Sequence, residues 1–199
     1  MRTKYILFGG LVLVLLSLVA WGVAFVKTFP QKYPEKTLAI EAKVTEFFHS
    51  VTLPLKIAQL SAKEPDAHIR MPVYGARVSS IRDTWGASRG NGRVHEGQDI
   101  FAARGTPVFS GTNGYILRIG NSGLGGNHVF VIGAGGRRYY YAHLDAIAEN
   151  LHPGQYVNTD TVIGFVGATG NAETTPPHLH FGMYERRKAL NPLPLLIDR

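Results

Sequence analysis

Short β-type runs, separated by glycines, follow one another along this chain from Met71 onward. Each run is too short for a buried helix and is bounded by turn-forming residues, which is typical of strands. The runs that we predict as strands are 78–81, 107–109, 115–119, 129–132, 138–142, 162–166 and 178–184. The glycine-rich segment 133–136 predicts a hairpin turn between two of them. The pattern predicts a mainly β domain, built as an antiparallel two-sheet open sandwich or barrel.

The N-terminal part has a different composition, because residues 5–26 are almost entirely apolar and carry no charge. About 20 such residues can cross the hydrocarbon core of a bilayer as a helix. The length favours an uncleaved anchor, whereas the small residues at positions 22–24 would suit signal peptidase cleavage. We predict a transmembrane anchor or a signal peptide over residues 1–27, and in either case the rest of the chain is exported.

Residues 28–69 are predicted to connect this segment to the β domain, which we place at residues 70–199. The polar stretch 29–36 contains two prolines and has the composition of a stiff linker. A helical stripe of apolar residues follows at Ile40, Val44, Phe47, Phe48 and Val51. It predicts a short amphipathic helix that ends at Pro54. We expect this helix to pack on the domain, and an arm that sets the distance from the membrane or contacts a partner is the alternative.

The chain contains no cysteine, so its fold uses no disulfide and any metal site must use His, Asp or Glu. The formal net charge is +7. Outside residues 1–30 the charge balance is mildly basic, which suits an anionic layer such as a cell wall or lipid headgroups and is also common on solvated surfaces. We predict no nucleic-acid partner.

The first candidate site motif is His95-Glu-Gly-Gln-Asp99. It begins like the helical zinc signature with two histidines four residues apart, but Asp99 stands at the position of the second histidine. Gly97 disfavours a helix, so we place His95 and Asp99 at a strand end or in a loop. Imidazole nitrogens and carboxylate oxygens are both zinc ligands.

The second candidate motif is His178-Leu-His180, inside the predicted strand 178–184. Residues two apart in a strand point to the same side, so both imidazoles can reach one metal ion. The spacing does not say which of the two histidines binds it.

The third candidate is His143, which follows the aromatic predicted strand 138–142. By the same alternation, Tyr141 and His143 are predicted to share a face, where Tyr141 could stack along a substrate. Tyr139 and Tyr140 are ordinary strand residues by propensity.

Each motif is weak alone, because a single strand histidine is more often a core or surface residue than a ligand. Together they supply one carboxylate, several imidazoles and no competing thiol. A catalytic zinc site needs three protein ligands and an open position, and the remaining histidines can serve as acid, base or oxyanion donor. We expect no role for His49, His68 and His152, and His128 lacks a partner at ligand spacing, although it could line a groove.

The three motifs, in this order, resemble those of the lysostaphin-type zinc endopeptidases of peptidoglycan. The matching segments are His95-x-Gly97-x-Asp99, Tyr141-Ala-His143-Leu and Pro177-His-Leu-His180-Phe, with the glycine-rich stretches 105–108, 125–126 and 167–170 between them. The resemblance covers about residues 70–192 and leaves residues 1–69 outside. It implies a fold of lysostaphin type for the β domain.

Carried over residue by residue, the resemblance implies a zinc ion (Zn2+) as cofactor, with His95, Asp99 and His180 as its ligands. His178 and His143 become the two catalytic histidines that do not bind the metal. The family pattern has an apolar residue where this chain has Gln98, and we expect this departure to alter only local packing. No ligand or catalytic position is missing.

The resemblance further implies a zinc-dependent endopeptidase that hydrolyses peptide cross-links of bacterial peptidoglycan through metal-activated water. The intact set of five residues argues against a non-catalytic cell-wall-binding module that activates another wall hydrolase. The predicted tether argues against a diffusible peptidase that acts on proteins. We expect peptidoglycan peptides and the membrane as partners. The domain would lie in the cell envelope, periplasmic if anchored and secreted if the N-terminus is cleaved.

Overall fold

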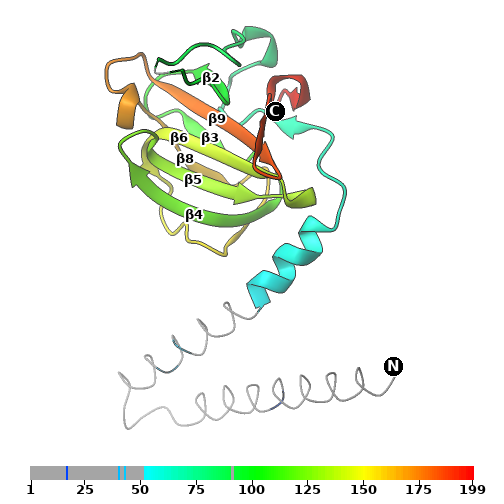
Figure 1. Cartoon of the computed structure of the whole chain (residues 1–199). Helices are drawn as coiled ribbons and strands as arrows, with labels where there is room; N and C mark the ends of the chain where they lie inside the picture. The colour runs from blue at the N-terminus through cyan, green and yellow to red at the C-terminus, as the bar shows by residue number, and fades with distance from the viewer. Residues whose placement is uncertain (1–16, 18–39, 41–42, 44–51, 91) are drawn as a thin grey trace. The chain divides into compact units, whose positions relative to one another are not determined.

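The computed structural model describes residues 17, 40, 43, 52–90 and 92–199 (Figure 1). The chain divides into two compact units, Met1–Pro54 and Leu55–Arg199. The predicted anchor or signal peptide 1–27 lies outside the described residues apart from Ser17, and so do the linker 29–36 and positions 44–51 of the predicted helix. Within the described part of the chain, no helix is long and apolar enough to cross a membrane.

Residues 52–61 are helical, so the prediction that a helix ends at Pro54 is wrong. Proline lacks a backbone N–H and restricts the residue before it, but it does not restrict the residues that follow. The leucine, lysine, alanine and glutamine residues at positions 55–60 all favour a helix. Beyond the helix, the Asp66 carboxylate accepts a hydrogen bond from the Thr112 hydroxyl, which ties this segment to the β domain.

The β domain contains eleven strands among the residues that the structure describes. Their bounds are β1 Ile69–Arg70, β2 Gln98–Phe101, β3 Pro107–Phe109, β4 Gly114–Ser122, β5 Gly126–Ile132, β6 Arg138–Ile147, β7 Tyr156–Val157, β8 Val162–Val166, β9 His178–Glu185, β10 Lys188–Leu190 and β11 Leu196–Ile197. Short 3-10 turns lie between them, at η1 Val78–Ser80, η2 Ala134–Gly136, η3 Gly170–Ala172 and η4 Leu193–Leu195.

Nine strands form one antiparallel sheet with the main order β10-β9-β6-β5-β4-β7. β2 pairs with β9, and β8 pairs with both β3 and β6, so the sheet branches at β9 and at β6 and does not close (Figure 1). β1 and β11 form a separate parallel pair. The prediction of a mainly β, antiparallel and open fold is confirmed. The grouping differs from two antiparallel sheets, because β6 pairs with β9 up to residue 142, with β5 up to residue 144 and with β8 from residue 144 onward.

Most of the predicted strands are present, and two of them, β3 and β8, have the predicted bounds. The predicted strand 78–81 is wrong, because residues 78–80 form the turn η1. There the Ser80 hydroxyl donates to the Arg77 carbonyl at 2.7 Å, a local bond that competes with strand pairing. The sequence prediction missed β1, β2, β7, β10 and β11, which are two to four residues long.

The core of the domain lies against one face of the sheet. From β9, Leu179, Phe181 and Met183 are fully buried, and from β6 so are Tyr139 and Tyr141. Burying an apolar side chain of this size contributes roughly 1.5–3 kcal/mol relative to leaving it exposed. Because side chains alternate along a strand, the residues between these core positions face the opposite side of the sheet, where the candidate site lies.

Candidate metal centre

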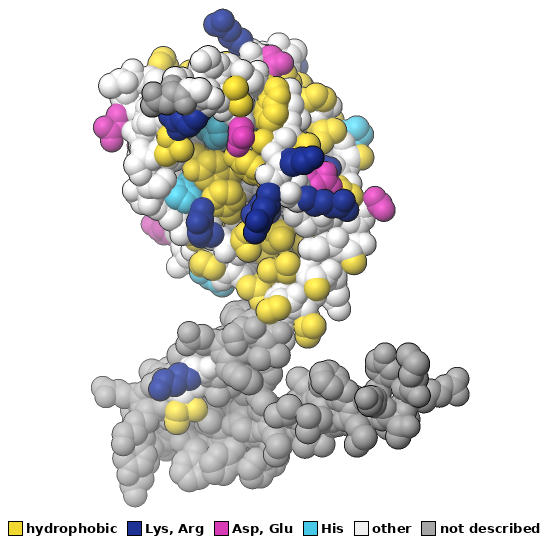
Figure 2. All heavy atoms as spheres, in the orientation of Figure 1, with side chains coloured by type: hydrophobic (Ala, Val, Ile, Leu, Met, Phe, Trp, Pro, Cys, Tyr) yellow, Lys and Arg dark blue, Asp and Glu magenta, His cyan; other side chains and the backbone are white. Residues whose placement is uncertain are grey.

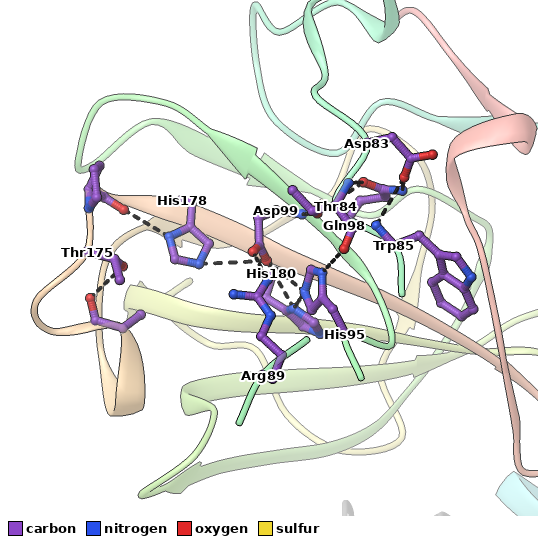
Figure 3. Close-up of polar contacts among 12 residues, drawn as sticks. Asp83, Thr84, Trp85, Arg89, His95, Gln98, Asp99, Thr175, His178 and His180 are labelled. Carbon is purple, nitrogen blue, oxygen red and sulfur yellow. Dashed lines mark hydrogen bonds and ion pairs between the residues drawn. The ribbon is translucent and has the colours of Figure 1, made fainter. Parts of the chain in front are cut away.

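Strand pairing brings two of the predicted site residues together. β2 and β9 are antiparallel neighbours, and Asp99 stands directly opposite His180 in their register. Residues in such a pair have Cβ atoms about 4.5–5.5 Å apart, so their side chains meet on the same face. His95 comes from the segment just before β2, and its side chain points at the same place (Figure 3).

The donor atoms of these three residues converge on one another. His95 Nε2 lies 2.8 Å from His180 Nδ1 and 3.0 Å from Asp99 Oδ1. His180 Nδ1 lies 3.2 Å from the same carboxylate oxygen. Their ligand atoms all lie within 4.8 Å of one another, and each residue type is a zinc ligand. His95, Asp99 and His180 could therefore hold a metal ion, and three protein donors beside a groove leave room for a further ligand.

Backbone carbonyls orient three of the histidine rings. The Nδ1 atoms of His95, His143 and His178 lie 2.7–2.9 Å from the carbonyl oxygens of Thr84, Thr169 and Pro176, in that order. A carbonyl can only accept, so each Nδ1 carries the proton and each Nε2 presents a lone pair. His180 differs, because its Nδ1 is the atom that faces Asp99 and His95.

His143 and His178 lie beside the three clustered residues. The centroids of their two rings are 5.0 Å apart, and the His143 ring lies 5.8 Å from that of His180. His178 Nε2 is 3.8 Å from Asp99 Oδ1. The structure therefore brings all five predicted site residues into one cluster, with two imidazoles next to the group that could hold a metal.

A β-bulge places His143 in this cluster. Between the pairs Asn127–Leu144 and Val129–Tyr141, two residues of β6 stand opposite the single residue His128 of β5. His143 has φ of +61°, which is uncommon outside glycine, and the turn of the backbone there brings its side chain to the groove.

The bulge makes the prediction about Tyr141 wrong. Tyr141 does not share a face with His143, because the extra residue interrupts the alternation on which the prediction rested. Its side chain is fully buried in the core, and its hydroxyl accepts a hydrogen bond from the Gly111 N–H at 2.9 Å. It therefore cannot stack along a substrate. Tyr140, which stands opposite Gly182 of β9, lines the groove instead.

Burial and the Asp99 carboxylate set the protonation of the cluster. Burial raises the pKa of Asp99, but the His180 and His95 imidazoles beside the carboxylate outweigh it and hold this pKa well below its usual range. Burial lowers the pKa of His180, and Asp99 opposes this shift only in part. Burial also lowers the pKa of His143 to about 4. At neutral pH the cluster therefore holds one carboxylate with neutral imidazoles at His143 and His180, the protonation states that a metal site needs.

The cluster opens into a groove between the sheet and three loops. Its lining outside the five residues includes Arg89, Gly92, Arg93, Val94, Glu96, Leu124, Gly125, Tyr140, Ala142, Asn171, Ala172, Thr175 and Tyr184. Figure 2 shows hydrophobic side chains gathered in the hollow of this face, with histidine and basic side chains around them. Tyr140 and Tyr184 are groove residues that the sequence analysis missed. Alternation along the predicted strand 178–184 places Tyr184 on the His180 face, whereas Tyr140 reaches the groove through the pairing of β6 with β9.

Arg89 and Gln98 lie around Asp99. The Arg89 guanidinium forms an ion pair with Asp99 Oδ2, on the side of the carboxylate away from the histidines. Gln98 is fully buried and makes hydrogen bonds to Asp83 and Thr84 (Figure 3) and to Asn191. The expectation that Gln98 alters only local packing is therefore wrong, because its amide joins three segments of the chain.

The other histidines lie apart from this cluster. His128 is buried, its Nδ1 lies 2.9 Å from the Gly126 carbonyl oxygen, and it packs against Phe130 and Tyr140 without lining the groove. His68 and His152 are exposed in loops, and His49 lies outside the described residues.

Two histidines and one aspartate that converge beside a groove are a donor set found in metal-dependent hydrolases. The chain belongs to peptidase family M23, whose profile matches residues 93–192. This match confirms the resemblance drawn from the motifs. It also confirms the prediction that the chain is a peptide hydrolase.

Among curated proteins, the L-Ala--D-Glu endopeptidase of Bacillus subtilis is 42% identical over 113 residues, which are 53% of this chain and 35% of that protein. Lysostaphin of Staphylococcus simulans is 38% identical over 112 residues, which are 53% of this chain and 22% of that protein. The chain thus spans about a third or less of the length of these relatives.

Solved structures of peptidases are also similar to this chain. The catalytic domain of lysostaphin from Staphylococcus simulans is similar with a TM-score of 0.52 and 34% identity, covering 59% of this chain and 92% of that one. A zinc-containing peptidase from Vibrio cholerae has a TM-score of 0.54 and 28% identity, covering 64% of this chain and 39% of that one.

Proposed function

We propose that this chain is a zinc-dependent endopeptidase that hydrolyses peptide cross-links of bacterial peptidoglycan. The observation that carries the proposal is the convergence of His95, Asp99 and His180 in an open groove. Membership of peptidase family M23 supports a peptide as substrate. The relatives named L-Ala--D-Glu endopeptidase and lysostaphin support the cell wall as the source of that peptide.

In this proposal His95, Asp99 and His180 would hold the zinc ion, because His95 Nε2, Asp99 Oδ1 and His180 Nδ1 face one another. The donor set fits zinc, because two neutral imidazoles and one carboxylate are ligands that it takes in catalytic sites. When bound, zinc supplies a Lewis acid and an activated water nucleophile to the reaction. The ion pair with Arg89 holds the other oxygen of Asp99, which orients the carboxylate.

His143 and His178 are proposed to move the proton. Each donates from Nδ1 to a backbone carbonyl, so each Nε2 is free to accept. One of them accepts the proton of the attacking water and then passes it to the leaving amine, while the other orients the attack or stabilises the oxyanion. The low pKa of His143 keeps it unprotonated at neutral pH, which suits a proton acceptor.

The place of action in this proposal is the cell envelope, outside the cytoplasm. The apolar residues 5–26 would anchor the chain in the membrane, or they would be removed as part of a signal peptide. An anchored domain would reach the wall layer that lies next to the membrane. A protease-protection assay on intact cells, followed by fractionation, separates the two forms by the mass and location of the mature chain.

Digestion of purified peptidoglycan by the full chain in mild detergent tests the activity, with and without a zinc chelator. We expect cross-linked dimers to fall to monomers only when the metal is present, and product masses then identify the bond. If nothing is cut while the chain binds wall sacs or stimulates another hydrolase, the non-catalytic alternative replaces this proposal. Cleavage that persists after complete removal of zinc would also overturn it.

A further inference from the structure

Gln98 is a fully buried polar residue in β2, immediately before Asp99. A buried glutamine is uncommon, and it is stable only when its amide is hydrogen-bonded. Here the carbonyl oxygen accepts from the Thr84 N–H at 3.0 Å and from the Thr84 hydroxyl at 3.2 Å. The amide nitrogen donates to Asp83 Oδ1 at 2.6 Å and to Asn191 Oδ1 at 3.0 Å.

The neighbours of Gln98 allow only one orientation of its amide. The Thr84 N–H can only donate, so it must face the oxygen of the amide. The Asp83 carboxylate can only accept, so it must face the nitrogen. All four hydrogen bonds are then made with correct polarity, and the donor and acceptor capacity of the side chain is used completely.

Thr84 links this hydrogen-bond network to the metal centre (Figure 3). Because its hydroxyl donates to Gln98, its oxygen can accept from the Asp99 N–H at 3.0 Å. Its backbone carbonyl accepts from Nδ1–H of His95 at 2.7 Å. Thr84 therefore fixes the backbone of Asp99 and the tautomer of His95. Gln98 in turn fixes Thr84 through its own hydrogen bonds.

We propose that Gln98 is a positioning residue for the metal centre, acting through Thr84 to fix His95 and Asp99. This inference rests on the proposed role of His95 and Asp99 as metal ligands. Because His95 stands outside the sheet, strand pairing does not set its ring, whereas the hydrogen bond from Nδ1 to Thr84 does. Residues that orient metal ligands in this way typically change metal affinity or activity 10–100-fold when they are removed.

An apolar residue at position 98 would fill the same space without these bonds. It would leave the Thr84 N–H without its partner and free the hydroxyl to rotate away from Asp99. The Asp83 side chain would keep only its bond from the Trp85 N–H, at 3.0 Å. The effect of such a change is therefore expected at the metal centre as well as in the stability of the fold.

The test is the zinc dissociation constant of the full chain, measured by competition with a fluorescent chelator, together with the melting temperature of the metal-free protein. Gln98→Met keeps the length of the side chain and removes its four hydrogen bonds. We expect it to weaken zinc binding about tenfold or more. The matched control is Val157→Ala, a buried change in β7, which should lower the melting temperature without changing zinc affinity.

A second pair of variants tests the path through Thr84 and does not depend on whether Gln98→Met folds. Thr84→Ser keeps the hydroxyl and should bind zinc like the wild type, whereas Thr84→Val removes it and should bind more weakly. The double variant Thr84→Val with Gln98→Met should lose less affinity than the two single losses multiplied together. Losses that multiply would mean that Gln98 does not act through Thr84.

The outcomes separate this inference from the proposed function. If the wild type binds no zinc, the proposed function fails first. If the wild type binds zinc and cuts peptidoglycan, but Gln98→Met and Thr84→Val bind it equally well, only the positioning role is overturned. A loss of affinity in Val157→Ala as large as that in Gln98→Met would also overturn it, because the effect would then follow general stability.

Discussion

The candidate metal centre joins two regions that are held in place in different ways. Asp99 and His180 stand opposite each other on β2 and β9, where the ladder of backbone hydrogen bonds sets their separation. His95 stands in the segment 86–95, whose ends meet through bonds between Gly86 and His95 and between His95 and Ala87. Strand register thus sets the separation of two donors, while the ring of the third is oriented by its hydrogen bond to the Thr84 carbonyl.

A donor on a strand and a donor on a loop differ in how freely they can turn. A donor on a paired strand takes its backbone position from the sheet, and sites built on such elements are more precise than sites on loops. A donor on a loop can turn about its own bonds, and fixing it costs conformational entropy unless other groups hold it. Thr84 supplies that hold for His95. Substitutions in each region test whether the two contribute to zinc binding as differently as their geometry implies.

The largest effect is expected from His180→Ala, which removes a donor of the sheet. We expect zinc binding and peptidoglycan cleavage to be lost together, because the remaining two donors cannot make a three-ligand site. Elemental analysis of the purified full chain gives the zinc stoichiometry. His68→Ala, in an exposed loop, is the matched control and should keep both properties. An unchanged zinc content in His180→Ala would contradict its role as a ligand.

The next largest effect is expected from His143→Ala, which leaves all three donors in place. Removing a group that transfers a proton typically lowers the rate by about 10²–10⁴-fold. We expect such a loss in the rate of dimer cleavage, with one zinc ion still bound. Measuring both on the same sample separates a catalytic role from a ligand role. If zinc is lost with activity, His143 belongs to the metal site rather than to proton transfer.

Gly97→Ala tests the junction between the loop and the sheet. A Cβ at this position would lie 2.6 Å from Cε1 of His180 and 2.8 Å from the Phe181 carbonyl oxygen, so β2 and β9 would have to separate. Overpacking of this kind costs about 1–3 kcal/mol. We expect a lower melting temperature and weaker zinc binding. Gly123→Ala meets nothing within 4 Å and should change neither value.

The smallest effect concerns the stability of the metal-free protein between pH 6.5 and about 4. Burial lowers the pKa of His143 to about 4 from 6.5, so in this range the unfolded chain binds more protons than the folded one. Stability should therefore fall as the pH is lowered through this window. Thermal melts of the chelated protein should show a shallower slope for His143→Gln. An identical slope would mean that His143 does not contribute.

Local pattern was enough to predict much of the domain. Two-residue alternation in the segment 178–184 correctly placed His178 and His180 on one face, with Leu179 and Phe181 on the other. The runs 107–109 and 162–166 are strands with the predicted bounds. These predictions succeed because strand periodicity is a property of neighbouring residues, and burial of one face only strengthens it.

Long-range pairing decided the features that local pattern could not reach. Strand β2 was missed because it is four residues long and exists through its pairing with β9. Tyr140 lines the groove in place of Tyr141 because of the bulge at His143. The bulge arises from pairing, since one residue of β5 stands opposite two of β6. Neither feature leaves a periodic signal in the sequence.

The sequence by itself determined the chemistry that this protein can carry. With no cysteine, the donors had to be histidine and carboxylate, and the order of the three motifs identified the family and its candidate residues. Only the tertiary structure decided how those residues meet: the register that sets Asp99 against His180, the bulge that turns His143, and the buried amide of Gln98 behind Thr84. The physical reason is that residue type fixes donors, acceptors and charge, whereas distance and orientation arise from contacts between segments far apart in the chain.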